Sequence, residues 1–238
     1  NISILNHPEY GTTSTRPDGM FDLVVNGGGY LTIVYEKSGY LPVQRKVNVP
    51  WQDFAWAEDV VMTAYDTEST PIDLSTATDI QVAQGSLQTD DDGERQATLL
   101  FKPTTAATMT LADGTSSPLT SLTVRATEFT VGDNGPDAMP GELPATSAYT
   151  YAVSLTVDEA VAAGATHVDF SEPVISYVNN FLAFPVGAIV PVGYYDEDQA
   201  AWLPLDNGLV IEVLGDLDSD GVTEVDLDGD GLEDDATS

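Results

Sequence analysis

The sequence contains no cysteine, so disulfide bonds, thiolate catalysis and thiolate metal sites are excluded. It has only two histidines, His7 and His167, and nothing locates a third group that would orient either of them in a Ser-His-Asp set. Carboxylates are so abundant that no particular pair stands out as a glycosidase-like acid and base. We therefore expect no enzyme and no catalytic residue.

Basic residues are almost as scarce, with 7 lysines and arginines against 39 acidic residues and a formal net charge of −32. Nucleic acids and anionic membranes are bound by Lys and Arg that neutralise their negative charge, so both are excluded as partners. The charge balance favours cations as ligands. The alternative is that the acids outside the C-terminal tail are solvated surface, as in proteins of salty environments.

Long apolar runs are missing too. No stretch approaches the roughly 20 consecutive apolar residues of a membrane-spanning helix, so we expect no membrane insertion. Asn1 to Leu5 lack the basic start and apolar run of a signal peptide and have the pattern of a strand. We expect the chain to be an excerpt of a longer one, with the neighbouring domains of that chain as its partners.

Short β-branched and aromatic runs separated by Gly, Pro, Asp and Asn predict an all-β protein. One short helix is predicted over Val157 to Ala163, with Thr156 as N-cap and Gly164 as its end. The aromatic residues of the first segment are expected to fill its core: Tyr30, Tyr35, Tyr40, Trp51, Phe54 and Trp56. The clearest expected strands are residues 21–25, 30–35, 97–101, 122–127, 148–153 and 188–194.

Shifts in composition divide the chain into four parts. Residues 1–66 form a compact aromatic-rich domain, and residues 67–77, rich in Thr, Ser, Asp and Pro, form a linker. Residues 78–214 form a second β-sandwich, over whose surface the loose stretch 132–144 is expected to wrap. Residues 215–238 form an acidic tail.

The tail is the strongest chemical signal. It holds two Asp-x-Asp-x-Asp-Gly words ten residues apart, and each word can place three carboxylates and a main-chain carbonyl around one hard cation. Calcium prefers six to eight such oxygens, so Ca²⁺ is the predicted cofactor, and Asp226 is a candidate ligand for both loops. The alternative is a disordered acidic linker that binds nothing tightly. The predicted metal ligands are Asp216, Asp218, Asp220, Val222, Glu224, Asp226, Asp228, Asp230, Leu232 and Asp234.

Several uncommon words recur in order in the first segment: Leu5-Asn6-His7-Pro8-Glu9-Tyr10-Gly11, Arg16-Pro17-Asp18-Gly19-Met20-Phe21-Asp22 and Val49-Pro50-Trp51. With these words, residues 1–66 resemble the transthyretin-like (carboxypeptidase regulatory-like) domain of teneurins and of bacterial YD-repeat (Rhs) proteins. The resemblance implies a seven-stranded β-sandwich that acts as a rigid spacer without a catalytic role. It also implies a secreted or cell-surface location.

The later segments carry weaker likenesses. Residues 97–130 resemble the sandwich shared by ankyrins and netrin receptors, and by order along the chain residues 78–213 stand where teneurins have a plug domain. Some sandwiches of that group cut themselves at a His-Phe-Ser tripeptide, but here Asp169 precedes Phe170 and Ser171, which disfavours self-cleavage. The tail resembles thrombospondin type-3 and dockerin calcium modules rather than an EF-hand, since the twelfth loop position holds Leu227 or Thr237.

Two functional hypotheses follow. The first is a non-catalytic structural segment of a shell, fibre or adhesin, stabilised by calcium. The second is a carbohydrate- or protein-binding adhesion module that uses Tyr194, Tyr195 and Trp202. Self-assembly and a cell-surface ligand are further candidate interactions.

Overall fold

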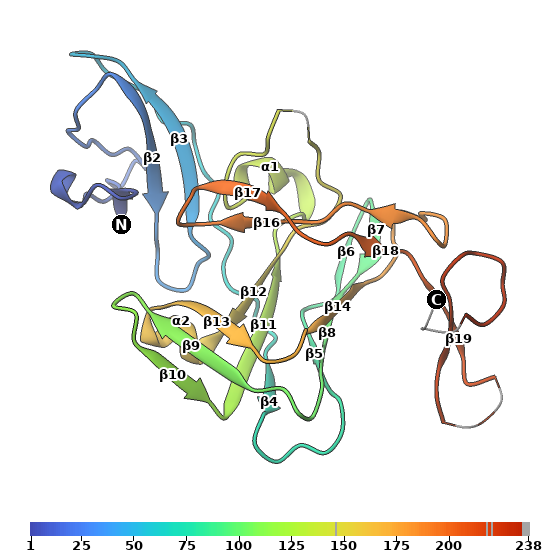
Figure 1. Cartoon of the computed structure of the whole chain (residues 1–238). Coiled ribbons are helices and arrows are strands. Elements are labelled where there is room, and N and C mark those ends of the chain that lie inside the picture. Colours follow the sequence, from blue (N-terminus) through green and yellow to red (C-terminus); the bar gives the residue numbers. More distant parts are fainter. Residues whose placement is uncertain (146, 218, 220, 235–238) are drawn as a thin grey trace. The chain divides into compact units, whose positions relative to one another are not determined.

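The computed structural model describes residues 1–145, 147–217, 219 and 221–234 of the chain (Figure 1). Its elements are almost all antiparallel strands, so the all-β prediction is confirmed. The chain divides into two compact units, Asn1–Asn179 and Asn180–Ser238. None of the described helices is long and apolar enough to cross a membrane.

The first domain is built on a three-stranded antiparallel sheet in the order β1 (Ile2–Ile4), β2 (Gly29–Tyr35), β3 (Val43–Val49). A short 3-10 helix, η1 (Pro8–Tyr10), follows β1. Three strands rather than the expected seven occur in residues 1–66, all of which are described. Isolated bridges, such as Ile2 with Thr13, attach the remaining segments to the sheet.

Residues 21–25 show why the strand count is lower than expected. They form no ladder, yet Phe21, Leu23 and Val25 pack against the buried core while Val24 is 89% exposed. The alternating apolar pattern therefore predicts which side chains face inward, as expected for extended chain. It does not supply a hydrogen-bonding partner strand.

The expectation that the aromatic residues fill this core is wrong for most of them. Tyr35 is buried and meets Phe21 edge to face at 5.9 Å, but Tyr30, Trp51 and Trp56 are 66%, 68% and 81% exposed. Phe54 is 91% exposed. The core is instead made mainly of aliphatic side chains from β1 to β3, namely Ile2, Ile4, Ile33 and Val43, together with Tyr35.

The second domain consists of three three-stranded sheets and a hairpin. The sheets, in strand order, are β12 (Val153–Val157), β11 (Ser121–Glu128), β4 (Thr70–Asp73); β14 (Ile175–Val178), β8 (Ala97–Phe101), β5 (Gln81–Gln84); and β10 (Ser116–Leu119), β9 (Ala107–Leu111), β13 (Ala165–Phe170). The hairpin pairs β6 (Gln88–Asp90) with β7 (Gly93–Arg95).

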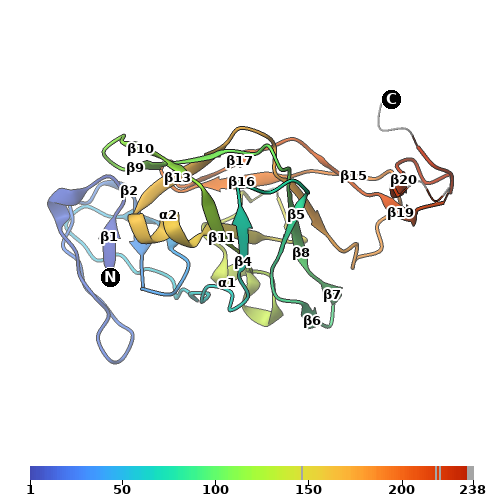
Figure 2. The same ribbon diagram turned by 90° about the horizontal axis from the view of Figure 1, so that it is seen from below.

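One apolar core lies between these sheets. Ile72, Leu99, Phe101, Leu122 and Val124, from three strands, are at most 4% exposed. Figure 2 shows β4 beside β11 on one side of this core and β5 beside β8 on the other. The predicted linker 67–77 therefore differs from the structure, because it contains β4, an edge strand in which Pro71 is tolerated.

The remaining elements of this unit are short helices. The predicted helix is present as α2 (Asp158–Ala163), and Gly164 ends it in the left-handed conformation at φ 66°. Its N-cap is Val157 rather than Thr156. The stretch 132–144 contains η2 (Gly132–Asn134) and α1 (Gly135–Ala138).

The second unit is a series of two-stranded pairings: β15 (Ile189–Val190) with β18 (Gly208–Leu209), β16 (Gly193–Asp196) with β17 (Ala201–Pro204), and β19 (Glu212–Gly215) with β20 (Glu224–Asp226). Residues 180–214 thus group with the acidic tail, unlike the predicted 78–214 sandwich. The expected strand 188–194 is divided in two at Pro191, which lacks the N–H that a continuous ladder needs.

Candidate functional site

A buried arginine closes the first domain onto the second. Arg45, on β3, is 5% exposed, and its Nη1 donates to the carbonyl oxygens of Gln44 at 2.7 Å and Met139 at 3.0 Å. Its Nη2 donates to the carbonyl oxygen of Asp137 at 2.7 Å. The Gln44 N–H also donates to the carbonyl oxygen of Pro140 at 2.7 Å. Residues 137–140, which we name the clasp, therefore contact the first domain, so the prediction that this stretch lies over the second sandwich is wrong here.

A second arginine fixes the point where the chain leaves the first domain. Arg125, on β11, donates to the main-chain carbonyl of Asp66 at 2.6 Å and holds the Asp158 carboxylate with two hydrogen bonds of 2.7 and 2.8 Å. The Asp66 N–H donates in turn to the Thr127 hydroxyl at 2.9 Å, and its carboxylate accepts the Ser86 N–H at 2.7 Å. The exit from the first domain is therefore bound to the second sandwich through the N–H, the C=O and the carboxylate of one residue, Asp66.

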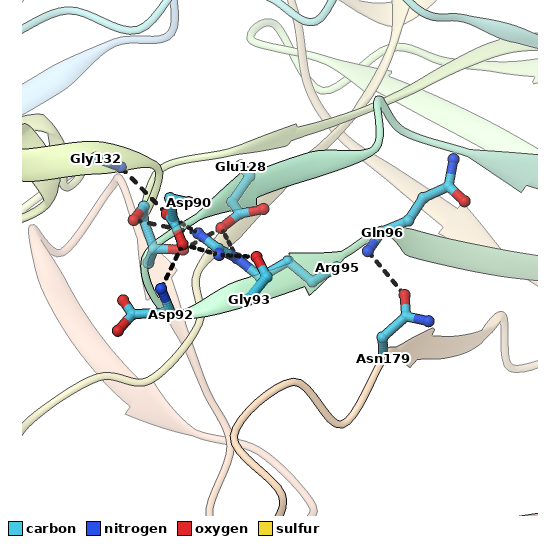
Figure 3. Close-up of polar contacts among 9 residues, drawn as sticks. Asp90, Asp92, Gly93, Arg95, Gln96, Glu128, Gly132 and Asn179 are labelled. Carbon is cyan, nitrogen blue, oxygen red and sulfur yellow. Dashed lines mark hydrogen bonds and ion pairs between the residues drawn. The ribbon is translucent and has the colours of Figure 1, made fainter.

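Arg95 anchors the chain just before the clasp (Figure 3). It is 1% exposed, donates from Nε to Glu128 at 2.6 Å, and forms a bidentate pair with Asp90 at 2.7 and 2.8 Å. The second Asp90 oxygen also accepts the Gly132 N–H at 3.4 Å. The guanidinium of Arg95 holds the pKa of Asp90 well below its usual range. This network joins hairpin β6–β7, β11 and Gly132, which precedes the clasp in the chain.

These three arginines were not singled out by the sequence analysis. A signal was available for Arg125, because it stands inside the expected strand 122–127 and the chain has only 7 basic residues. The partners could not be inferred, since Met139, Asp66 and Glu128 lie 94, 59 and 33 residues away along the chain from the arginines they bind.

The acidic tail forms two loops with the same internal hydrogen bonds. In each loop, the carboxylate of the first Asp accepts the N–H of the glycine that ends the Asp-x-Asp-x-Asp-Gly motif. Gly221 donates to Asp216 at 3.1 Å, and Gly231 donates to Asp226 at 2.8 Å. In each loop, the side-chain carboxylate of the ninth residue accepts the N–H of the second residue. Leu217 donates to Glu224 at 2.7 Å, and Leu227 donates to Asp234 at 2.6 Å. The ten-residue sequence repeat is thus also a structural repeat.

Backbone angles repeat as well. The fourth residue of each loop has positive φ, at 65° for Ser219 and 86° for Gly229, and so does the sixth, at 88° for Gly221 and 79° for Gly231. Glycine adopts this region without the steric cost that a side chain brings, whereas Ser219 bears that cost. The glycines of the motif are therefore required by the loop shape.

Three predicted ligands come together in the second loop. Ligand oxygens of Asp226, Asp228 and Asp234 all lie within 4.8 Å of one another, with Asp226 buried at 1% exposure and Asp228 exposed. The N–H groups of Gly229 and Gly231, together with other main-chain donors, lower the pKa of Asp226. Three ionised carboxylates at this separation repel one another, so the arrangement suits a bound cation.

The other predicted ligands are placed differently. Asp216 is exposed at the start of the first loop, and the Glu224 side chain is buried where β20 begins. Asp230 accepts the Leu232 N–H at 2.8 Å. The side chains of Val222 and Leu232 face solvent, which leaves only their carbonyls for the predicted role. Asp218 and Asp220 lie outside the described residues.

The second loop is seated directly on the rest of its unit. A Cβ added to Gly229 would lie 3.1 Å from the Val186 carbonyl oxygen, and one added to Gly187 would lie 3.1 Å from the Asp228 carbonyl oxygen. Gly187 is itself tied to this unit by its N–H, which donates to Val210 at 2.9 Å. The two backbones approach so closely that only glycine fits at both places.

Two other sequence hypotheses find little support. The Ser171 hydroxyl accepts the Ala106 N–H at 2.8 Å, while the exposed His167 contacts Asp169 at 3.3 Å and Thr166 at 3.0 Å. This arrangement does not place the imidazole as a base on the serine. Tyr195 and Trp202 pack against each other at 5.4 Å, half-buried across hairpin β16–β17, with Tyr194 46% exposed beside them.

Replacing Arg45 with Met should destabilise the chain by about 3 kcal/mol, because carbonyl oxygens of the clasp lose a buried charged donor. The free energy of unfolding is measured by urea titration of the full chain. Arg16→Met is the matched control: Arg16 is half-exposed beside Asp18 and Asp22, so its loss should cost less than about 1 kcal/mol. Equal losses in the two variants would contradict a structural role for Arg45.

Replacing Asp90 with Asn should lower stability in a pH-dependent way. Because the pKa of Asp90 is lower in the folded chain than in the unfolded one, its charge stabilises the fold. That contribution is complete above the unfolded pKa of about 4 and is lost as the pH falls toward the folded pKa. The gap between wild type and Asp90→Asn should therefore be widest at pH 5 to 7 and close below about pH 4 in urea titrations. The exposed neighbour Asp91→Asn should show no such gap.

Replacing Gly229 with Ala should weaken the packing of the second loop against Val186. Gly215, at φ 89° with open space around it, is the matched control, since Ala pays the same cost of about 1 kcal/mol for positive φ at both positions. Only Gly229→Ala adds an overlap with Val186. Exchange of the Gly187 amide hydrogen should be about tenfold faster in Gly229→Ala than in Gly215→Ala. Similar exchange rates in the two variants would show that the contact between Gly229 and Val186 does not stabilise this region.

Comparison with known proteins bears on the first domain. Residues 1–62 match the family model of the teneurin TTR-like domain. Mouse teneurin-3 is 45% identical over 75 residues and human teneurin-1 is 37% identical over 75 residues, in each case 32% of this chain and 3% of the relative. Drosophila melanogaster teneurin-m is 45% identical over 53 residues, 22% of this chain and 2% of the relative.

The chain thus spans only about 3% of the length of these curated relatives. No solved structure matches the chain. The predicted likeness of the first segment to teneurins is confirmed, and residues 1–62 are similar to the teneurin TTR-like domain.

Proposed function

We propose that the chain is a non-catalytic structural segment of a large secreted or cell-surface protein of the teneurin-like, YD-repeat kind. In this role the TTR-like domain and the sandwich act as one rigid block, and the acidic loops bind calcium. The junction formed by Arg45 and Arg125 carries the proposal. Domains joined by a small polar interface move relative to one another by default, whereas here the buried Arg45 and the partly buried Arg125 each bond to main-chain carbonyls across the boundary.

The neighbouring domains of the same longer chain are the proposed partners. The TTR-like module occupies about 3% of each relative that carries it, so it is embedded in much larger proteins there. A block that is stiff across its own domain boundary can hold such neighbours at a set spacing. A flexible linker at residues 67–77 would not, because its ends would sample many separations.

Calcium is the proposed ligand of the tail. Oxygens of Asp226, Asp228 and Asp234 already converge, and the Leu232 carbonyl and Asp230 complete the second loop's donor set. The first loop repeats the same hydrogen bonds and would offer Asp216, Asp218, Asp220, Glu224 and the Val222 carbonyl. An all-oxygen set on irregular loops suits calcium better than magnesium, which demands near-ideal octahedral geometry.

A bound cation would also remove the repulsion that the carboxylates exert on one another in a chain of net charge −32. Since the second loop is seated against Val186 and Gly187, that gain is transmitted to the remainder of its unit. Calcium at a hundred times its dissociation constant stabilises a folded protein by about 2.7 kcal/mol per site.

A second candidate function is adhesion, and the exposed aromatic residues of the first domain favour it. Phe54 and Trp56 are 91% and 81% exposed, which is unusual for side chains with so much apolar area. Tyr195 and Trp202 are half-buried against each other and are weaker candidates for a contact surface. Phe54 and Trp56 of the TTR-like domain are therefore better candidates for an adhesion surface than Tyr195 and Trp202.

Calorimetric titration of the full chain with calcium tests the metal proposal. We expect saturable binding of about two ions, one for each loop, and little heat from magnesium. Asp216→Asn should remove one ion, and Asp226→Asn should remove one, or both if that carboxylate is shared. Asp206→Asn, an exposed acid of the same unit, should leave binding unchanged. Identical titrations for all three variants would leave the tail as an acidic linker without a metal site.

A further inference from the structure

Strand β3 is covered along only half of its free edge. In the order β1-β2-β3 it is the outer strand, and its first three residues, Val43 to Arg45, are buried beside the clasp. Lys46 and Asn48, farther along the same strand, are exposed. The chain's own clasp thus occupies one end of this edge and leaves the other end open.

The register identifies which main-chain groups point outward. Thr32, on β2, directs its carbonyl toward β1, where it accepts the Leu5 N–H at 2.9 Å, so its neighbours Leu31 and Ile33 bond to β3. Their partners are Val47 and Arg45. The main-chain N–H and C=O groups of the residues that alternate with Arg45 and Val47 therefore point away from β2. The Gln44 N–H shows this, since it donates to the Pro140 carbonyl outside the sheet.

Lys46 and Asn48 alternate with Gln44 and present their N–H and C=O groups on the same free edge. In the part of the chain that the structure describes, neither residue's main chain has a hydrogen-bond partner beyond the sheet. Unpaired groups of this kind are a template for another strand. Lys46 alone offers some protection against unspecific pairing, since charged residues on an edge discourage it.

Aromatic side chains border the open half. Tyr30, opposite Asn48 in the register, is 66% exposed and lies 5.3 Å beneath the Lys46 ammonium. Trp51, two residues after the strand ends, is 68% exposed. Rings beside unpaired main-chain groups supply the apolar contact that a docked strand needs in addition to its hydrogen bonds.

We propose that the open half of β3, Lys46 to Val49, binds an extended, net basic segment of a partner protein, which adds to the sheet as a fourth strand. Two observations select this occupant. The edge continues one on which the clasp, where helix α1 ends, already uses the Gln44 N–H for a main-chain hydrogen bond to Pro140. The chain carries −32 charges, and the exposed acids Asp53, Glu58 and Asp59 follow in the adjoining loop, so a basic segment is attracted and an acidic one repelled.

The strand also sets the pattern of the segment. Val47 and Val49 share the core-facing side, so the incoming strand needs β-branched apolar residues at alternate positions. Opposite Lys46 it needs an uncharged residue, because like charges directly across a sheet are destabilising. Its basic residues therefore belong at its ends. A second copy of this chain is disfavoured as the occupant, since it brings the same −32 charges.

The test uses the full chain and a synthetic peptide, acetyl-Lys-Val-Thr-Val-Thr-Val-Thr-Val-Lys-amide, whose binding is measured by calorimetry at physiological salt. Asn48→Pro removes one outward N–H and no bond to β2, and should weaken binding about tenfold. Asn48→Ala keeps the N–H and is the matched control, with affinity within about twofold of wild type. Circular dichroism checks that both variants fold.

Changes in the peptide test the same contact without altering the protein. Methylation of alternate peptide nitrogens on the pairing side should abolish binding, and replacing both terminal lysines with glutamates should weaken it about tenfold or more. Equal binding of the methylated peptide, or equal loss in Asn48→Pro and Asn48→Ala, would overturn the proposal in favour of unspecific attraction to the acidic surface. A dimer in sedimentation that Asn48→Pro abolishes would overturn it in favour of a second copy.

Discussion

The scarcity of positive charge is the constraint on which this structure depends. Against 39 acidic residues the chain has 7 basic ones; Arg45 and Arg125 join its first two domains, and Arg95 joins separate segments of the second. A guanidinium offers five donors in a fixed plane, so one side chain can join several carbonyl or carboxylate oxygens from distant segments. The boundary is thus bonded through very few residues, each of which stands where two or more segments meet.

The acidic tail meets the same shortage in another way. No lysine or arginine follows Arg125 in the sequence, and Asp226 is stabilised by main-chain N–H groups at Gly229 and Gly231. These donors can orient a carboxylate, but they carry no full charge to offset a cluster of three. In the proposed function an external cation offsets this cluster, where the junction uses the internal cations of its arginines.

The sequence predicts those features that depend on neighbouring residues. Apolar alternation locates β8 and β11 within a residue or so, Gly164 ends the short helix, and the repeated Asp-Gly words anticipate two equivalent loops. Features that depend on distant residues are missed. The clasp joins Arg45 to carbonyls more than ninety residues away, and nothing near Trp51 or Phe54 reveals that no second layer covers them. An aromatic run predicts large apolar area, but only tertiary contacts decide whether that area is buried.

Strand β3 takes part both in the domain boundary, through Arg45, and in the open sheet edge, through Lys46 to Val49. Arg45 and Lys46 are consecutive: the first reaches back to the clasp, and the second stands where the free edge opens. A strand is cooperative along its length, so order gained at Lys46 to Asn48 favours the conformation in which Arg45 meets Met139 and Asp137. By linkage, if occupation of the open edge stabilises the clasp, the clasp favours that occupation by the same coupling free energy. The stiffness of the domain boundary and the availability of the edge are therefore properties of one strand, and a change in either is felt by the other.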